Sequence, residues 1–484
     1  MSSSESFYWH DYETSGADPS TDRPMQFAGV RTDANLEVIG EPLVIYNRPT
    51  PDYLPHPGAI RVTGISPYTA LQEGLPECEF IDRIHAELAA PGTCGVGYNS
   101  IRFDDEVTRF TLYRNFFDAY ERERNHGRSR WDLIDVTRAF YALRPQGIHW
   151  PQREDGLPSF RLEDLTAANG IDHGAAHDAL SDVMATIGVA RLLRNTHADL
   201  FDTLFAHRSR EALTPLLDLK GMKPLLHVSG MFGAERGNLA VVVPLALHPK
   251  IKTEVICADL SRAPEFLDQS VEEIRATLFA KRDELPEGAL RPPLKTIRLN
   301  RSPVLLPMDW AKDGPAEHWR LDGDVLREHL TRIRAARDAD PQSFTRHIQG
   351  IYEDSAFPPR TDPDSMLYDG FFDRSDKNLF SAIREASPEV LATRSWVFKD
   401  GRLPELLFRY RARNYPESLR GEEPHQWRLH CQQQLREGGF DLATFDAEFA
   451  EVTAAPDLSD RQQAALADLS RYRDELAEFL AIEH

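Results

Sequence analysis

The sequence predicts an α/β protein in which a mixed β-sheet flanked by helices is followed by a small, mainly β domain and a helical C-terminal domain. Three observations carry this prediction. Up to about residue 195, strand-like segments give way to alternating helix and strand patterns. Short β-like runs separated by Gly and Pro follow, and from about residue 352 the pattern is helical and charge-rich. A chain of 484 residues is also too long for one ordinary core.

The N-terminal part contains the longest series of regular elements. FYWHDYET has the aromatic character of a buried strand, and DDEVTRFTLYRNFFDAY has helical spacing of apolar residues. Ser159 can cap the start of one later helix, and Gly170 can close its end. We expect strands at 7–14, 26–33, 38–46 and 93–99, and helices at 78–89, 104–120, 159–170 and 177–193.

The remaining chain divides into two regions of different texture. HVSGMFG, LAVVVPLAL, EVICADL and KTIRLN predict a small β domain with a helical insert near 267–280. A long helix is expected near 459–482. We therefore expect a short mobile tail at 1–6 and domains at 7–195, 196–350 and 351–484.

Composition excludes several classes of protein. Hydrophobic residues make up 41% of the chain, which is typical of a globular protein. No apolar run is long enough to span a bilayer, and MSSSES is no secretory signal. Cys78, Cys94, Cys257 and Cys431 lie far apart and form no CxxC pair, so we expect a cytoplasmic protein without a cysteine zinc site.

A formal net charge of −21 argues against a generally nucleic-acid-binding surface. An enzyme needs only a local basic lining, however, and a metal site itself needs acidic residues. Any contact with nucleic acid is therefore expected inside a groove.

Four acidic residues and one histidine predict a two-metal site. Asp11 and Glu13 are two residues apart on a predicted strand, so both side chains project from one face. Asp104 lies where a strand and loop lead into a helix, and Asp182 lies inside a later helix. Carboxylates are the ligands that Mg²⁺ prefers, and two such cations promote phosphodiester hydrolysis.

His177 is the candidate general base. Five helical residues turn through about 500°, which leaves His177 and Asp182 about 140° apart if both lie within the helix. The two converge only if His177 lies at the junction of loop and helix, as Gly174 upstream suggests. Imidazole titrates near neutral pH and can then deprotonate the attacking water.

Each of these residues also has an ordinary structural interpretation. Asp11 and Glu13 could lie on a solvated strand face, although burial of an aromatic strand makes carboxylates without partners costly. Asp104, or its neighbour Asp105, could cap a helix. His177 is one of 17 histidines, and the acidic residues around it single it out.

Together these residues resemble a known family. DxE, N-x-x-x-F-D and H-x-x-x-x-D form the motif set of the histidine-containing branch of the DEDD exonucleases. Longer strings resemble bacterial exonuclease I from residue 7 to about 480. They include HDYETSG, RPMQFAGVRTD, YLPHPGAI, GYNSIRFDDEVTR, LRPQGIHWP, DGLPSFRLEDLT, HVSGMFGAERGN and LLFRYRARNYP. Ser15 departs from the Phe or Gly common in relatives, which leaves packing against a terminal base open.

The resemblance implies a 3′→5′ exonuclease that degrades single-stranded DNA, releases 5′-mononucleotides and acts in DNA repair and recombination. It implies an RNase H-like exonuclease domain, an SH3-like β domain and a helical C-terminal domain. Asp11, Glu13, Asp104 and Asp182 would bind two Mg²⁺ ions, with Mn²⁺ as a possible substitute, and His177 would be the base. Glu13 would also touch the terminal nucleotide, and Arg161 would contact a phosphate.

The stretch 102–144 is the expected DNA lining, because nine arginines and nine aromatic residues interleave there with eight acids. Arginine neutralises phosphate, and aromatic rings stack on unpaired bases. We expect about two-thirds of the nine aromatic residues to be core. The residues favoured for DNA contact are Arg109, Tyr120, Arg138 and Phe160, followed by Arg210, Tyr368 and the Arg409–Arg413 cluster.

The resemblance further implies binding of the acidic C-terminal tail of single-stranded-DNA-binding protein, for which Arg144 and Lys223 are candidate anchors. Solvated surface cations are the alternative interpretation of both. We expect a monomer without a membrane partner. Two other functions stay open, namely a 3′→5′ exoribonuclease and a non-catalytic single-strand-binding scaffold.

Overall fold

A computed structural model describes residues 5–174, 178–281, 284–285, 288, 290–312, 314–315, 319, 321–353 and 360–481. The chain forms two compact units. The first unit comprises residues 1–129, 173–186 and 359–484, and the second comprises residues 130–172 and 187–358.

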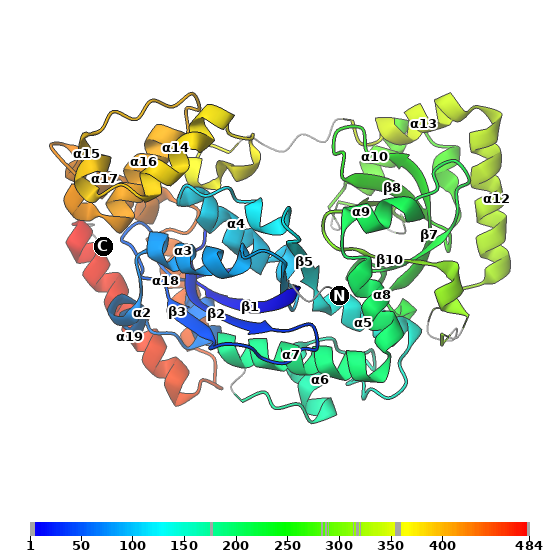
Figure 1. The fold of residues 1–484 in the computed structure, drawn as a ribbon, viewed down its shortest axis with the longest axis horizontal. Helices are drawn as coiled ribbons and strands as arrows, with labels where there is room; N and C mark the ends of the chain where they lie inside the picture. The colour runs from blue at the N-terminus through cyan, green and yellow to red at the C-terminus, as the bar shows by residue number, and fades with distance from the viewer. Residues whose placement is uncertain are drawn as a thin grey trace. The chain divides into compact units, whose positions relative to one another are not determined.

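A five-stranded mixed sheet organises the N-terminal part (Figure 1). Its order is β3-β2-β1-β4-β5. The strands are β1 (Ser6–Thr14), β2 (Pro24–Thr32), β3 (Leu43–Tyr46), β4 (Thr93–Gly97) and β5 (Ser129–Asp132). β1 pairs antiparallel with β2, where Asp11 faces Ala28 and Glu13 faces Gln26, and parallel with β4. The strand that carries Asp11 and Glu13 is therefore held on both sides.

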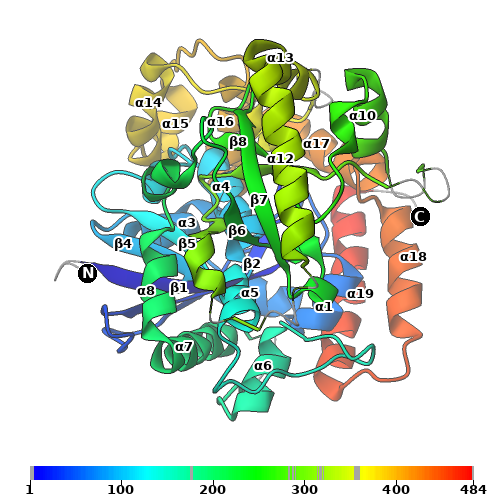
Figure 2. The same cartoon turned by 90° about the vertical axis from the view of Figure 1, so that its right-hand side faces the viewer.

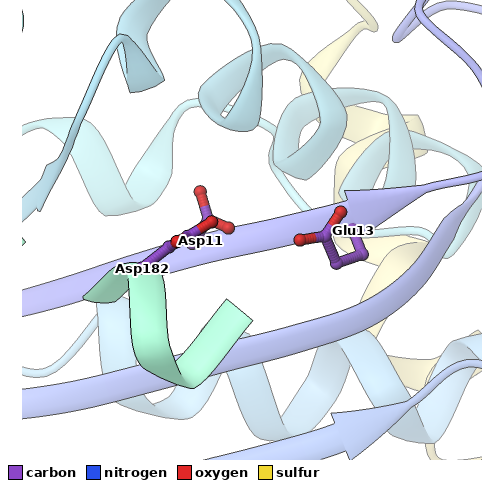
Figure 3. A group of neighbouring side chains, drawn as sticks. All are labelled: Asp11, Glu13 and Asp182. Atoms are coloured by element: carbon purple, nitrogen blue, oxygen red, sulfur yellow. The ribbon is translucent and has the colours of Figure 1, made fainter. Parts of the chain in front are cut away.

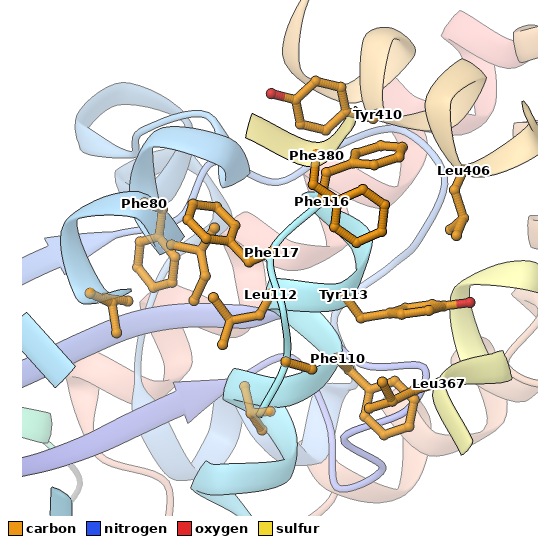
Figure 4. Close-up of a cluster of buried hydrophobic side chains, with 14 of the residues drawn as sticks. Phe80, Phe110, Leu112, Tyr113, Phe116, Phe117, Leu367, Phe380, Leu406 and Tyr410 are labelled. Carbon is orange, nitrogen blue, oxygen red and sulfur yellow. The ribbon is translucent and has the colours of Figure 1, made fainter. Parts of the chain in front are cut away.

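Helices α3 (Glu77–Leu88) and α4 (Asp104–Arg114) pack on the sheet through one large apolar cluster. Tyr8, Tyr12 and Phe27 of the strands meet Phe80 of α3 and Phe110 of α4. Figure 4 shows the same cluster reaching Phe380, Leu406 and Tyr410. The last three belong to α14 (Arg374–Arg384) and α16 (Leu403–Asn414). The N-terminal sheet and the C-terminal helices therefore share a core within the first unit.

A second apolar cluster of the first unit joins short helices near the sheet to the end of the chain. Ile60 and Ile65 pack with Trp427, Leu469 and Leu476. Ser459 caps the last helix with a reciprocal Gln462 contact. The helices of this cluster are α1 (Pro57–Thr63), α2 (Pro67–Glu73), α17 (Glu423–Glu437), α18 (Leu442–Thr453) and α19 (Asp460–Leu480), with Ala412 from α16. Helix α15 (Pro388–Thr393) instead contributes Leu391 to the first cluster.

A buried ion-pair network also joins distant segments of the first unit. Arg413 contacts Asp52 at 2.8 Å and Asp364, while Arg409 reaches Asp364 at 3.0 Å. Attraction to these arginines outweighs the loss of hydration and holds the pKa of Asp364 well below its usual range.

The second unit contains an antiparallel sheet of order β10-β6-β7-β8-β9. Figure 2 shows helices α12 and α13 beside β7 and β8. The strands are β6 (Leu225–Val228), β7 (Leu239–Leu247), β8 (Glu254–Asp259), β9 (Leu294–Arg298) and β10 (Val304–Pro307). Its helices are α5 (Leu133–Leu143), α6 (Leu162–Asn169), α8 (Ala198–Ala206), α9 (Arg210–Leu213), α10 (Val271–Leu278), α12 (Gly323–Ala339) and α13 (Pro341–Gly350). Helix α7 (Ala179–Thr196) begins in the first unit and ends in the second.

Specific contacts explain why α5 groups with this small β domain. The Trp319 indole N–H donates to the Ala142 carbonyl at 2.6 Å, and Arg130 donates to the Asn300 carbonyl at 2.9 Å. The buried side chains of Val242, Val255 and Leu305 form part of the sheet core.

Several local expectations are wrong in detail. The helix expected at 104–120 ends at Arg114, because Phe116 adopts a left-handed φ of 59° and its ring, like that of Phe117, turns into the core. The strand expected at 38–46 is regular over Leu43–Tyr46 alone. Ser159 does not cap α6; its hydroxyl contacts Asp164 at 2.5 Å, and Arg161 takes the N-cap position. Gly170 closes that helix at a φ of 65° as expected.

The region after residue 195 contains more helix than the sequence indicates. Helices α12 and α13 lie at 323–350, where a mainly β domain was expected. None of the four cysteines forms a disulfide. Within the described residues, no helix combines the length and the apolar character needed to cross a membrane.

Candidate active site

Three carboxylates converge at the site. One oxygen each of Asp11, Glu13 and Asp182 lies within 4.8 Å of the others. Asp11 and Glu13 project from the same face of β1, and Asp182 reaches them from the first turn of α7 (Figure 3). The alternation of side chains along β1 thus produces the shared face that the sequence predicts.

Asp104 lies beside this group at the start of α4. Its Oδ1 accepts the backbone N–H of Tyr12 at 3.1 Å, so it is tied to the strand between Asp11 and Glu13. The neighbouring Asp105 points elsewhere, into an ion pair with the buried Arg122 and within 3.8 Å of His10. Phe103 occupies the N-cap position, and both carboxylates lie in the first turn of the helix. The structure therefore favours Asp104, and not Asp105, as the acid of the site.

The electrostatics of the group are those of a cation site. Loss of hydration, reinforced by repulsion from Asp104, Glu13 and Asp182, raises the pKa of Asp11 well above its usual range. Burial and repulsion from Asp182 and Asp104 likewise raise the pKa of Glu13 to about 9. A bound cation would reverse these shifts by neutralising the carboxylates.

The sequence-predicted base, His177, falls outside the described residues. A different histidine contacts the acidic group. His173 Nε2 lies 2.5 Å from Asp182 Oδ1. Sequence reasoning missed His173 because the spacing of the motif points to His177; its place in the loop before α7 is the one signal that could have suggested it.

The acidic group fits hard divalent cations. Three carboxylates from β1 and α7, with a fourth acid on α4 alongside, match the ligand preference of Mg²⁺ or Mn²⁺. Without cations the same carboxylates repel one another, and such a group is costly to keep for structural reasons alone. The chemistry of the donor set therefore fits a site for divalent cations.

Family models match three consecutive parts of the chain. Residues 8–190 match an exonuclease family, residues 208–354 an exonuclease I SH3-like domain, and residues 361–476 an exonuclease I C-terminal domain. Exodeoxyribonuclease I of Escherichia coli is 45% identical over 429 residues, which cover 88% of this chain and 89% of the relative. The chain belongs to the exonuclease I family. Its second sheet is accordingly the SH3-like domain of that family, and the chain is an enzyme.

Solved structures of the family show the same fold. Exonuclease I from Methylocaldum szegediense superposes with a TM-score of 0.92 at 45% identity, covering 98% of this chain and 99% of the other. A zinc-bound complex of Escherichia coli exonuclease I with single-stranded DNA superposes with a TM-score of 0.91 at 42% identity, covering 98% and 99%. In that protein, a divalent metal and single-stranded DNA are present together.

The first unit contains three of the residues expected to contact DNA. Tyr368 is 48% exposed and accepts a hydrogen bond from Arg109 at 3.0 Å, while its hydroxyl donates to Glu106. Tyr120 is half-buried beneath Arg109 and lies edge-on to Phe371, which is 82% exposed. Arg109 thus contacts both Tyr120 and Tyr368, and Phe371 adds an exposed ring beside Tyr120.

Arg109 itself is buried. Its guanidinium makes two contacts of 2.7 Å with Glu123 and one of 2.9 Å with Glu106. In this arrangement Arg109 orients Tyr368. To contact a DNA phosphate, Arg109 would have to release Glu106 or Glu123 and pair with the phosphate instead.

The Arg409–Arg413 cluster also lies in the first unit, where Arg409 and Arg411 are buried in ion pairs with Asp364 and Glu423. The remaining candidate contacts lie in the second unit. Arg161 is exposed and pairs with Glu163 at 2.6 Å. Phe160 lies edge-on to Tyr141, with Arg138 over its ring at 5.8 Å, and Arg138 pairs with Asp135. Arg210 is exposed at the start of α9.

The two candidate anchors for an acidic tail also belong to the second unit. Arg144 donates to the carbonyls of Leu143 and Trp310 and lies over the Trp310 ring at 5.4 Å. Lys223 is exposed.

Many residues of the stretch 102–144, which the sequence predicts to line the DNA groove, are buried in the core instead. Six of the nine aromatic residues between 102 and 144 are buried, which agrees with the expected two-thirds. Five of the nine arginines are buried as well. Arg114, for example, pairs with Glu77 at 2.8 Å. These five are Arg109, Arg114, Arg122, Arg128 and Arg130.

Proposed function

We propose that this enzyme degrades single-stranded DNA from the 3′ end by two-metal-ion hydrolysis and releases 5′-mononucleotides. The observation that carries the proposal is the convergence of Asp11, Glu13 and Asp182 within 4.8 Å, with Asp104 alongside, in a chain of the exonuclease I family. Mg²⁺ is the proposed cation, and Mn²⁺ is an alternative with the same ligand preference.

The five residues of the proposed site have two main roles, cation binding and proton transfer. Asp11, Glu13, Asp104 and Asp182 hold the cations, which when bound lower the pKa of water and neutralise charge at the phosphate. His177 accepts the proton of the attacking water. Glu13, at the end of β1, also positions the terminal nucleotide.

We further propose that DNA is held by stacking and by charge. Tyr120 and Tyr368 present rings to unpaired bases, and Phe160 does so beside Arg138 and Arg161. Arg161 and Arg210 contact backbone phosphates, because both are exposed. Arg109 holds Tyr368 in place in the resting arrangement and reaches phosphate after exchanging a carboxylate.

Three broader proposals rest on the family. The acidic tail of single-stranded-DNA-binding protein is held by Arg144 and Lys223, the protein is a monomer, and it acts in repair and recombination. We propose domain boundaries at residues 7–195, 196–350 and 351–484.

Digestion of matched DNA and RNA oligonucleotides tests the proposed substrate. Single strands labelled at the 5′ end should shorten progressively in Mg²⁺, with DNA degraded faster than RNA. Faster loss of RNA would make the enzyme an exoribonuclease. Binding of both strands without any shortening in Mg²⁺ or Mn²⁺ would instead support a non-catalytic scaffold.

A further inference from the structure

His173 holds one carboxylate of the acidic group. Its ring is 8% exposed, and Nε2 lies 2.5 Å from Asp182 Oδ1. A carboxylate oxygen accepts hydrogen bonds, so the ring nitrogen is the donor. His173 precedes α7 and lies nine residues before Asp182 in the chain, so the contact joins a residue before the helix to its first turn.

The backbone of Asp182 is already fixed by other contacts. Its N–H donates to the Asp178 carbonyl at 3.0 Å, and its carbonyl accepts the Thr186 hydroxyl at 2.8 Å. The freedom that remains to Asp182 is rotation of its side chain. A bond to one carboxylate oxygen restricts that rotation and keeps the group turned toward Asp11 and Glu13.

We propose that His173 is a positioning residue that sets the affinity of the acidic group for divalent cations. The inference rests on the proposed metal site. Residues that hydrogen-bond a metal-binding carboxylate pre-orient it, and their loss typically weakens metal affinity about 10–100-fold. His173 acts through Asp182 and takes no part in proton transfer to or from the substrate.

The contact admits a competing interpretation that predicts the opposite result. His173 could occupy Asp182 in place of a cation and be displaced when the cation arrives. Removal of the ring would then strengthen cation binding, whereas removal of a positioning residue weakens it. The sign of the change in affinity therefore separates the two interpretations.

Mn²⁺ binding to the full-length enzyme without DNA, followed by electron paramagnetic resonance of free Mn²⁺, tests the proposal. His173→Ala should weaken binding about 10–100-fold. His173→Gln should restore part of the affinity, because its amide N–H can donate to Asp182. His425→Ala, an exposed histidine on α17, is the matched control and should bind as the unaltered enzyme does.

Nuclease assays add a second measurement, the Mn²⁺ concentration that gives half-maximal activity. A merely structural role of His173 would leave this concentration unchanged. The Mn²⁺ concentration for half-maximal activity should rise in His173→Ala, while the rate at saturating Mn²⁺ changes much less. Unchanged or tighter Mn²⁺ binding in both His173 variants would overturn the positioning role. The proposed metal site itself would be overturned by a different result. In that case the unaltered enzyme binds no Mn²⁺, or Asp11→Asn leaves its Mn²⁺ binding unchanged.

Discussion

The backbone N–H of Tyr12 donates to Asp104 Oδ1 at 3.1 Å, and this bond ties the start of α4 to the strand that carries Asp11 and Glu13. A main-chain donor cannot rotate away, so the position of Asp104 is set by β1 itself. The next residue, Asp105, faces Arg122 instead. Two adjacent acids thus have different tasks, one in the acidic site and one in the core.

The pair of variants Asp104→Asn and Asp105→Asn should separate these tasks. Asp104→Asn removes a proposed cation ligand, so nuclease activity should fall by about 10³-fold or more while the melting temperature changes little. Asp105→Asn leaves the buried Arg122 without its charge partner, so stability should fall by about 3–5 kcal/mol with cation affinity retained. Thermal melts and Mn²⁺ titrations of both variants measure this. Equal loss of stability in both would refute the division.

The acidic group should make the cation-free protein sensitive to high pH. Burial and repulsion raise the pKa of Glu13 to about 9, so the folded state binds a proton that the unfolded chain has released above about pH 4.5. Stability in a chelator should therefore fall as pH rises between about 5 and 9. Glu13→Gln should flatten this dependence, and saturating Mg²⁺ should remove it. A Glu13→Gln protein with the unaltered pH profile would contradict the assignment.

The ion-pair network around Asp364 should support the first unit. Asp364→Ala leaves Arg413 and Arg409 buried without a shared partner, which should cost about 3–5 kcal/mol. The pKa of Asp364 is lowered on folding, so its contribution is present above about pH 4 and is lost as pH falls through the folded value. Melting temperatures at pH 7 and at acid pH measure both effects. Asp369→Ala, at an exposed position in the same segment, should leave the melting temperature unchanged.

The role of His177 predicts a pH-dependent rate. With imidazole as the base, the rate should fall as pH drops through about 6.5, and His177→Ala should lose about 10²–10⁴-fold activity together with that dependence. Steady-state rates from pH 5.5 to 8.5 provide the measurement. An unaltered pH profile in the variant would assign proton transfer to another group.

The sequence alone was enough to predict the acidic group, because its geometry follows from local rules. Residues two apart on a strand share a face, and Asp11 and Glu13 do so here. The helix expected to run to residue 120 ends at Arg114 because the core draws in Phe116 and Phe117, and helical periodicity does not contain that tertiary contact. Tertiary packing overrides local pattern in such places.

The basic residues were harder to place. The sequence predicted Arg109 and Arg114 in the DNA lining. In the structure both are buried, because Arg109 pairs with Glu123 and Arg114 with Glu77. Glu123 and Glu77 lie 14 and 37 residues from these arginines in the chain, so only the fold brings each pair together. The contact of His173 with Asp182 was missed for the same reason, because it joins residues nine apart that helical or strand periodicity does not bring together.

A crystal structure of the enzyme with a 3′-terminal DNA oligonucleotide and Mn²⁺, with anomalous scattering used to locate the ions, tests the central proposal most directly. We predict two Mn²⁺ peaks about 4 Å apart, held by Asp11, Glu13, Asp104 and Asp182, with the 3′-terminal phosphodiester between them. Anomalous peaks elsewhere, or an oligonucleotide whose 3′ end lies away from Asp11 and Glu13, would contradict it.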